Sequence, residues 1–405
     1  MTSTITNLLP QITSLENKIS TINDILATAT ASVDVISYSQ MEEKLAYSLS
    51  ILVNQEFIAT ATATATSELA AATSNISAAE SALSSIIEAN NLYGMHPSYG
   101  GNMAVAIVMG LFLAIHSGLG IWYRTWWFGI SYFCGCGLEL AGYIGRILSA
   151  HDVDNVDYFL DQIVTLTIAP CFIMAGIYFL LGQLIIVYGP QYALLKPMHY
   201  SYIFISCDVI SLAIQAAGGA IAAVNVVDYE SPDSGTHIMV AGLAFQVFSM
   251  SVFIFFFAHF LYKIQYFHPD KYEQFENGEA FDPEHKSFRQ ARFFKHFIFV
   301  ICLGVIFVFV RCIYRVVELA EGWSGYLITH EAYFMILDAL MMALTCLCFS
   351  VFHPGFFFGK NGVQLVKSKK RTEVNHKEYQ NSEYDVELQH NNLEEINQRT
   401  EKEAY

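Results

Sequence analysis

The sequence predicts an all-α, polytopic membrane protein with seven transmembrane helices, its N-terminus outside the cell and its C-terminus in the cytosol. Of its 405 residues, 54% are hydrophobic and only 14% are charged, and the mean hydropathy is +0.38. This composition is typical of membrane proteins and not of soluble enzymes. A helix needs about 20 apolar residues to cross a bilayer. Seven apolar runs of about this length follow one another at 102–123, 126–148, 160–186, 201–223, 237–262, 296–318 and 331–352.

The first 100 residues are predicted to form an extracellular tail rich in Ser, Thr and Ala. They contain two lysines against nine acids, and they lack the basic start and apolar core of a signal peptide. Apolar residues spaced three and four apart between Ile12 and Leu26 predict one short amphipathic helix. The rest of the tail is expected to be disordered. Asn75 begins the triplet Asn-Ile-Ser, so it is a candidate for N-glycosylation.

The charges of the connecting loops set the predicted orientation, because short cytosolic loops carry an excess of Lys and Arg. The connections expected inside carry Arg124, Lys196 and the bases of 263–295. We expect the last of these connections to be a solvated loop that ends in a membrane-surface helix. The connections expected outside carry acids, namely Asp152, Asp154, Asp157, Asp228, Glu230 and Asp233.

These features divide the chain into an extracellular tail, a seven-helix transmembrane domain and a disordered cytosolic tail, at 1–100, 101–355 and 356–405. Four bases lie in the cluster Lys367–Arg371, just after the last apolar run. Anionic lipid of the inner leaflet attracts such residues with about 1 kcal/mol for each base. The cluster therefore fits either an anchor to that lipid or a simple flank that stops membrane transfer.

One apolar run organises the expected interior of the membrane domain. The run from Trp126 to Leu148 contains Glu139 near its middle and Arg146 toward one end. Seven residues separate these two charges, so both project from one face of a helix. A central charge costs a few kcal/mol in a bilayer. The glycines Gly135, Gly137, Gly142 and Gly145 of the same run permit close contact with a neighbouring helix. We expect this face to be paired internally and turned toward protein or a water-filled groove.

Three further runs carry polar residues at helical spacing. The fourth run has a stripe of Asp208, Ser211 and Gln215, and the seventh has Glu331 and, seven residues on, Asp338. The sixth run has a stripe of its own, formed by Arg311, Arg315 and Glu318. Isolated charges would be too costly inside the membrane, so these stripes are expected to converge and pair.

The convergence has two interpretations that can hold together. In one, the charges form an ion-pair cluster that only fixes helix packing. In the other, they line a cleft that accepts a charged lipid headgroup while the acyl chain stays in the bilayer. On the second interpretation, the headgroup contacts are Glu139, Asp208, Gln215 and Asp338. The residues that balance their charge are Arg146, Arg311, Arg315 and Glu318.

Several classes of protein are disfavoured by what the sequence lacks. It contains no nucleotide-binding P-loop and no HExxH motif, so we expect no ATPase, no metal site, no cofactor and no enzymatic activity. It has no long basic face for nucleic acid. All eight cysteines fall in apolar runs, so no disulfide framework is expected. Glycine-rich faces permit self-association without requiring it.

Several motifs, in order, resemble the fungal RTA-like family of lipid-translocating exporters. They are LELAGYIGR at 138–146, TIAPCFIMAGIY at 167–178, the stripe from Asp208 to Gly219, AGLAFQV at 241–247, the run from Arg311 to Gly325 and HPG at 353–355. The resemblance extends over about 92–358. Within that family, ITHEAYFMILDALMMA at 328–343 is most similar to the sphingoid long-chain base efflux proteins of yeasts.

The resemblance implies a plasma-membrane protein that moves sphingoid bases, or aminosterols and related cationic amphiphiles, from the cytosolic to the outer leaflet. Resistance to toxic lipids would follow from this activity. Acids within the membrane would complement such cations. The alternative is a seven-helix sensor that responds to lipid asymmetry or membrane stress and signals through the 263–295 loop and the C-terminal tail.

Overall fold

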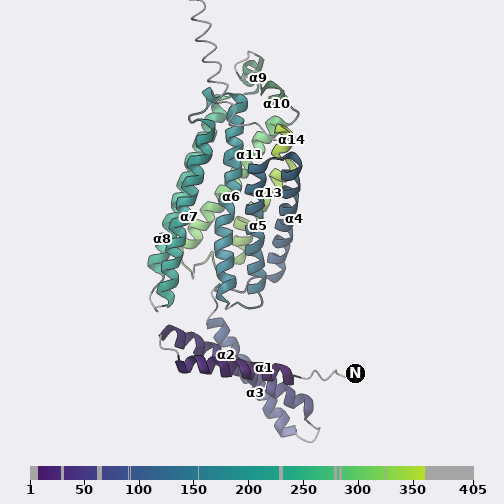
Figure 1. Cartoon of the computed structure of the whole chain (residues 1–405), viewed down its shortest axis with the longest axis vertical. Helices are drawn as coiled ribbons and strands as arrows, with labels where there is room; N and C mark the ends of the chain where they lie inside the picture. The colour runs from purple at the N-terminus through teal and green to yellow at the C-terminus, as the bar shows by residue number, and fades with distance from the viewer. Residues whose placement is uncertain are drawn as a thin grey trace, which may run out of the picture.

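The computed structural model describes residues 8–360 apart from 29–31, 62–65, 90, 92, 154, 228–230, 278–280, 282–284 and 324, and this part of the chain contains helices and turns but no strand. Its long helices stand side by side in a bundle (Figure 1). The continuous ones are α4 (Tyr99–Tyr123), α5 (Trp126–Ser149), α6 (Val156–Tyr188), α7 (Pro197–Val227), α8 (Asp233–Lys263) and α11 (Phe294–Ala320). A further long helix of the bundle follows α11 and is divided into three segments. They are α12 (Glu331–Phe334), the π-turn η3 (Met335–Leu340) and α13 (Met341–Val351).

Six of these helices are long and apolar enough to cross a membrane: α4, α6, α7, α8, α11 and the segmented helix that begins at Glu331. The helix α5 is not among them, since its glycines, its tyrosines and the charges of Glu139 and Arg146 lower its hydropathy. It nevertheless packs between α4 and α6 over its length (Figure 1). The all-α prediction is confirmed, and a seventh span formed by α5 stays a prediction.

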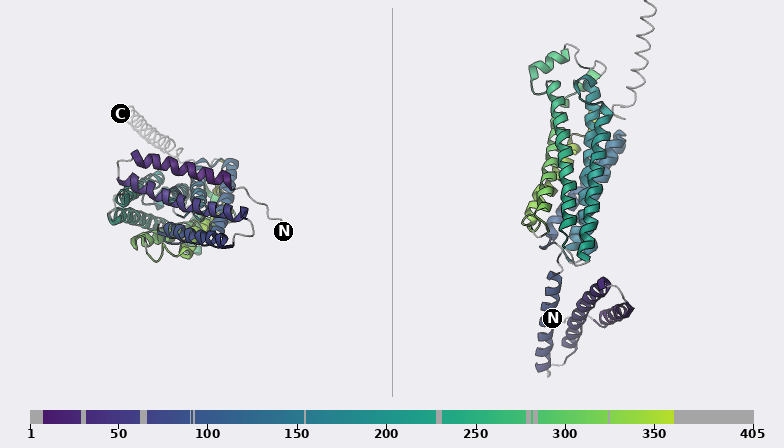
Figure 2. Two further views of the ribbon diagram at one scale, coloured as in Figure 1. Left: turned by 90° about the horizontal axis from the view of Figure 1, so that it is seen from below. Right: turned by 90° about the vertical axis from the view of Figure 1, so that its left-hand side faces the viewer.

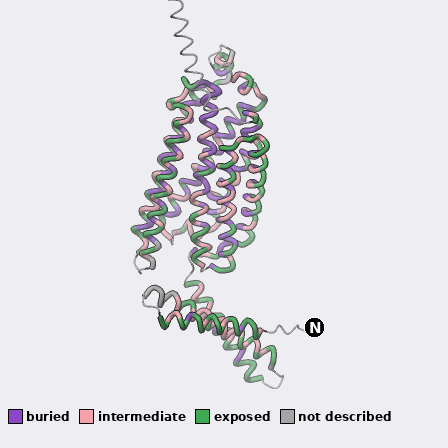
Figure 3. Tube along the Cα trace, viewed as in Figure 1, coloured by how far each residue is buried: buried purple, intermediate pink, exposed green. Residues whose placement is uncertain are grey.

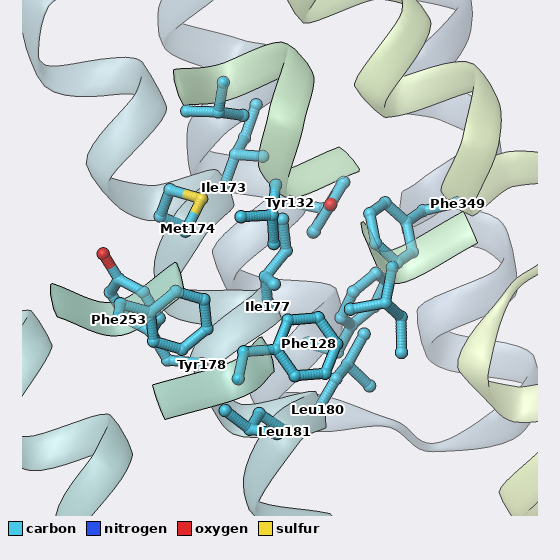
Figure 4. Close-up of a cluster of buried hydrophobic side chains, with 14 of the residues drawn as sticks. Phe128, Tyr132, Ile173, Met174, Ile177, Tyr178, Leu180, Leu181, Phe253 and Phe349 are labelled. Carbon is cyan, nitrogen blue, oxygen red and sulfur yellow. The ribbon is translucent and has the colours of Figure 1, made fainter. Parts of the chain in front are cut away.

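The centre of the bundle is α6. Most of its residues from Ile173 to Tyr188 are buried, as the purple stretch in Figure 3 shows. Its side chains Ile173 and Ile177 lie beside aromatic rings from α5 and α13 (Figure 4). Among these rings, Phe128 and Tyr132 stack with their centroids 4.2 Å apart. The polar groups discussed below are therefore held on helices that pack around one dense core.

The first 90 residues correct the expectation of a largely disordered tail with one short helix. The structure has three helices there, α1 (Leu9–Thr28), α2 (Ser32–Thr60) and α3 (Thr66–Ala89). They lie as a group beyond one end of the bundle, which we call the α3 end (Figures 1 and 2). Alanine has the highest helix propensity, and Ile12, Ile22, Ala72 and Ala79 are buried. Asn75 is exposed on α3.

The connection between α8 and α11 also differs from the expected solvated loop. It contains α9 (Pro269–Asn277) and α10 (Lys286–Arg289) at the opposite end of the bundle, the α9 end. The Arg289 guanidinium donates to the Val187 carbonyl at 2.6 Å and pairs with Glu276 at 2.8 Å. The hydroxyls of Tyr188 and Tyr272 lie 2.9 Å apart, and burial raises the pKa of Tyr272. The segment is thus docked on the last turn of α6, where carbonyl groups lack helical partners.

Two short elements complete the described chain. The 3₁₀ turn η1 (Pro190–Tyr192) follows α6, and α14 (Pro354–Phe358) follows α13. Phe358 is buried against Phe294 of α11, so the helical domain continues slightly past the expected boundary at residue 355. The predicted disordered tail beyond residue 360, with the cluster Lys367–Arg371, lies outside the described residues.

Glycines allow α5 to approach α6 closely, and this contact can be tested at Gly142. A Cβ atom there would lie 2.6 Å from both Leu166 Cγ and Thr165 Oγ1. We expect Gly142→Ala to lower the free energy of unfolding by about 1–3 kcal/mol, the usual cost of overpacking. Thermal unfolding of the purified protein in detergent measures the change.

The matched control is Gly118→Ala in α4, because nothing lies within 4 Å of the added Cβ. Alanine is favoured over glycine in a helix by about 1 kcal/mol, so this variant should unfold at the same temperature as the wild type or higher. Equal unfolding temperatures for both variants would contradict the close α5–α6 packing.

Candidate functional site

Five charged side chains from α5, α11 and η3 form one chain of ion pairs inside the bundle. Arg311 contacts two acids: its Nε lies 3.1 Å from Asp338 Oδ1, and its Nη2 lies 3.8 Å from Glu139 Oε1. Arg315 continues the chain, with Nε 3.8 Å from Asp338 Oδ2 and Nη1 2.7 Å from Glu318 Oε2. The order is Glu318, Arg315, Asp338, Arg311, Glu139. The expected convergence is therefore observed between the second, sixth and seventh apolar runs.

At the buried end of this chain of ion pairs, several polar groups make no hydrogen bond within the described structure. Glu139 and Asp338 are both fully buried, and no carboxylate oxygen of either makes a hydrogen bond within the described structure. The Tyr143 hydroxyl, one turn along α5, is likewise buried without a partner there. Arg311 uses its Nη2 group to donate to the Leu166 carbonyl of α6 at 2.6 Å. Unsatisfied buried polar groups of this kind are rare and call for an explanation.

The π-turn η3 carries Asp338. Such turns are uncommon and occur frequently at functional sites. Glu331, at the start of the same segmented helix, pairs instead with Arg146 of α5, with Oε1 2.8 Å from Nη2. The acid-rich face of the seventh apolar run is thus divided between two clusters.

Arg146 belongs to the second cluster and is not paired with Glu139, contrary to the expectation from their shared face. Its three nitrogen atoms donate to Asn102, Gln162 and Glu331, each at 2.8 Å. Its guanidinium carbon lies 4.1 Å from the centre of the Phe334 ring. Arg146 lies in the last turn of α5, two helical turns from Glu139. At that level α12 places Glu331 within 2.8 Å of the Arg146 guanidinium.

The second cluster contains residues that sequence reasoning did not assign to the site. Asn102, Gln162 and Glu331 are not among the predicted contacts, although the position of Glu331 seven residues before Asp338 places both acids on one helix face. The Glu331 carboxylate also accepts hydrogen bonds from Asn102 Nδ2 at 2.8 Å and from the Ser98 backbone amide at 2.7 Å. It therefore ties the start of α4 to α5 and α12.

The third polar region follows the stripe of α7. Asp208 is 4% exposed and accepts a hydrogen bond from the Tyr178 hydroxyl at 3.1 Å. It makes no ion pair within the described part of the chain. Two turns along, the Gln215 amide donates to Ser211 Oγ at 2.8 Å and to Gln246 Oε1 at 3.3 Å. The stripe therefore packs against α6 and α8 and does not join the Arg311 chain.

A pocket lies between these three regions toward the α3 end. The volume inside it that water-sized molecules can occupy is about 60 Å³. One water molecule needs about 10–15 Å³ of such volume. Apolar side chains such as Phe159, Leu166 and Phe334 form much of its wall. Its polar lining includes Arg146, Gln162, Thr167, Gln215, Arg315 and Glu318.

Four of the eight predicted site residues line the pocket. Of the four predicted headgroup contacts, only Gln215 lines the pocket; Glu139, Asp208 and Asp338 do not. Three of the four residues predicted to balance charge, namely Arg146, Arg315 and Glu318, do line it. The pocket thus combines apolar walls with charges of both signs.

These observations define a helical membrane protein with a polar pocket among its long helices and their connections. The chain belongs to the RTA1-like protein family, whose model matches residues 132–361. It is 41% identical over 294 residues to the sphingoid long-chain base transporter RSB1 of Saccharomyces cerevisiae strain Lalvin EC1118, covering 68% of this chain and 77% of that protein. The family predicted from the motifs is confirmed.

Two more distant relatives come from the same species. Protein RTM1 of Saccharomyces cerevisiae is 30% identical over 236 residues, covering 57% of this chain and 67% of the relative. Protoporphyrin uptake protein 1 of strain S288c is 31% identical over 238 residues, covering 57% and 69%. No solved structure matches the chain. Two of the three relatives are named as a transporter and an uptake protein.

The dependence of the buried acids on Arg311 can be tested by removing its charge. Arg311→Ala leaves Glu139 and Asp338 without their shared partner, and breaking a buried pair in this way costs about 3–5 kcal/mol. We expect a large loss of folded protein, measured as the detergent-solubilised monodisperse fraction and by its thermal unfolding.

Two further variants make this test specific. Adding Glu139→Gln and Asp338→Asn to Arg311→Ala removes the carboxyl groups left without a partner and should restore part of the stability. Arg292→Ala, at an exposed position, should change stability little. If Arg311→Ala and Arg292→Ala behave alike, the ion-pair chain does not stabilise the bundle.

Proposed function

We propose that this protein moves sphingoid long-chain bases, or related cationic amphiphiles, from the cytosolic to the outer leaflet of the plasma membrane and thereby protects the cell from toxic lipids. Similarity to a sphingoid base transporter supports lipid transport in general. The single observation that carries the proposal is a small pocket with charged and amide groups among otherwise apolar helices. A headgroup can enter such a pocket while the alkyl chain stays in lipid.

The headgroup of a sphingoid base offers an ammonium and hydroxyl groups, and the pocket offers partners for both. We assign the ammonium to Glu318 and the hydroxyl groups to Gln162 and Gln215, all of which line the pocket. Asp208 lies farther along α7 from Gln215 and has one hydrogen-bond donor, Tyr178. We assign it to a second position of the cation during passage, since an acid without an ion pair attracts a cation inside a low-dielectric bundle.

The direction of movement rests on the orientation of the chain. We place the α3 end outside the cell and the α9 end in the cytosol, with α5 as a seventh span. Loop charges support this, because the bases of 263–295 gather at the α9 end and acids border the α3 end. The exposed position of Asn75 on α3 is compatible with glycosylation on the outside.

Purified protein in liposomes that contain a labelled sphingoid base tests the proposal directly. We expect the wild type to accelerate movement between leaflets. Asp208→Asn should slow this movement about tenfold or more, because a hydrogen bond to a charged group contributes about 1.5–3 kcal/mol. The matched control is Asp157→Asn, an exposed acid at the start of α6, which should leave the rate unchanged.

The same assay separates the proposal from its alternative. A correctly folded wild-type protein that moves no labelled base would contradict transport and favour the sensor. Deletion of residues 361–405 then provides a second criterion, because a transporter should keep its lipid movement and a sensor should lose its cellular output.

A further inference from the structure

The ion-pair chain has an accessible end and a sealed end. Glu318 and Arg315 line the pocket, and the Arg315 side chain is 19% exposed. Asp338 and Glu139 have no exposed surface, and Arg311 between them has 3%. The signs alternate along the whole chain, beginning and ending with an acid. A change of charge at the pocket is therefore connected to the buried end through direct contacts.

The ion-pair chain contains three acids and two arginines, so it has one acid more than it has bases. Each arginine has an acid within 3.1 Å, whereas Glu139 reaches only Arg311, at 3.8 Å, and its oxygens make no hydrogen bond in the described structure. An uncompensated carboxylate inside a protein costs several kcal/mol. A group in this position avoids the cost by holding a proton.

The surroundings of Glu139 favour a proton over a metal ion. No group of His, Cys, Asp and Glu in the described residues has the arrangement of a metal site. The charged groups that face Glu139 come from α11 and η3, and within the described chain α4 and α6 add none. The facing ionisable groups are Arg311 and Arg315 of α11, Asp338 of η3, Tyr143 of α5 and Cys346 of α13.

We propose that Glu139 carries an exchangeable proton, which leaves when a cationic headgroup binds at the pocket end of the ion-pair chain. An ammonium that pairs with Glu318 competes with Arg315 for that carboxylate. Arg315 then moves its charge toward Asp338, and Arg311 is freed to compensate Glu139. The Glu139 O–H bond breaks, and the proton leaves the sealed end of the ion-pair chain, with water outside the bundle as its final acceptor.

This inference rests on the proposed function and adds its energy source. One positive charge enters the chain as another leaves, so the bundle never contains an extra uncompensated charge. Exchange of a lipid cation for a proton lets a proton gradient drive export without nucleotide. The step needs no other reactant, because the proton comes from Glu139 and its acceptor is water.

The first test measures protons directly. Purified full-length protein in weakly buffered detergent, with a pH indicator, is titrated with sphinganine. The wild type should release protons in proportion to the bound base, and Glu139→Gln should release none. The control Asp157→Asn alters an exposed acid at the start of α6, outside the ion-pair chain and the pocket lining, so it should keep the release. Binding to the wild type without proton release would overturn the inference.

The second test does not depend on lipid binding. Infrared spectroscopy of the base-free wild type should show the carbonyl stretch of protonated carboxyl groups, and its intensity should fall in Glu139→Gln and stay unchanged in Asp157→Asn. An absent band, or one whose intensity Glu139→Gln leaves unchanged, overturns the proton site.

Proteoliposomes keep the two proposals apart. Lipid movement that neither responds to a pH gradient nor moves protons overturns the proton inference and leaves the proposed function intact. If no lipid moves but the infrared band depends on Glu139, the proton site is supported and the proposed function fails.

Discussion

The contact of the Arg311 guanidinium with two buried carboxylates is the constraint on which the rest of the bundle depends. Charges in the hydrocarbon region are tolerated only when they meet partners inside the protein. Arg311 meets Glu139 from α5, Asp338 from η3 and the Leu166 carbonyl from α6. Four elements must therefore pack together at one level before this arginine can be buried. The glycine contacts between α5 and α6 bring the helices close enough for that.

The pocket follows from the same constraint. Arg311 pairs with buried acids away from the pocket, whereas Arg315 and Glu318 pair with each other and line the pocket. Arg146 closes another side through Asn102, Gln162 and Glu331. The result is a small polar space whose charges are already balanced, so a headgroup is accepted by exchange of partners and not by filling an unpaired site.

Helix periodicity predicted much of this arrangement. The apolar run from Trp126 to Leu148 corresponds to α5 almost residue for residue, and the stripe of Arg311, Arg315 and Glu318 does face acids. The pairing of Arg146 with Glu331 was not predicted. The spacing of residues in the sequence indicates which face of a helix they share, but not which neighbouring helix packs against that face.

Local composition misled in two other places. The Ala- and Ser-rich segment before residue 90 indicated disorder, yet its helices bury residues such as Ile22 and Ala72 against one another. The 263–295 loop looked solvated, because the contacts of Arg289 with Val187 and Glu276 depend on chain segments distant in sequence. The pocket could not be predicted either, since it is formed by side chains from several helices.

The π-turn at Met335–Leu340 adds a mechanical consequence. In an uninterrupted α-helix, Glu331 and Asp338 would share one face, since successive residues turn by about 100°. A π-turn accommodates one extra residue, which allows Glu331 to reach Arg146 while Asp338 reaches Arg311. Rewinding this turn into regular α-helix would rotate one carboxylate away from its arginine. The segment between the two acids is thus a torsional element, and its winding and the two ion pairs can change only together.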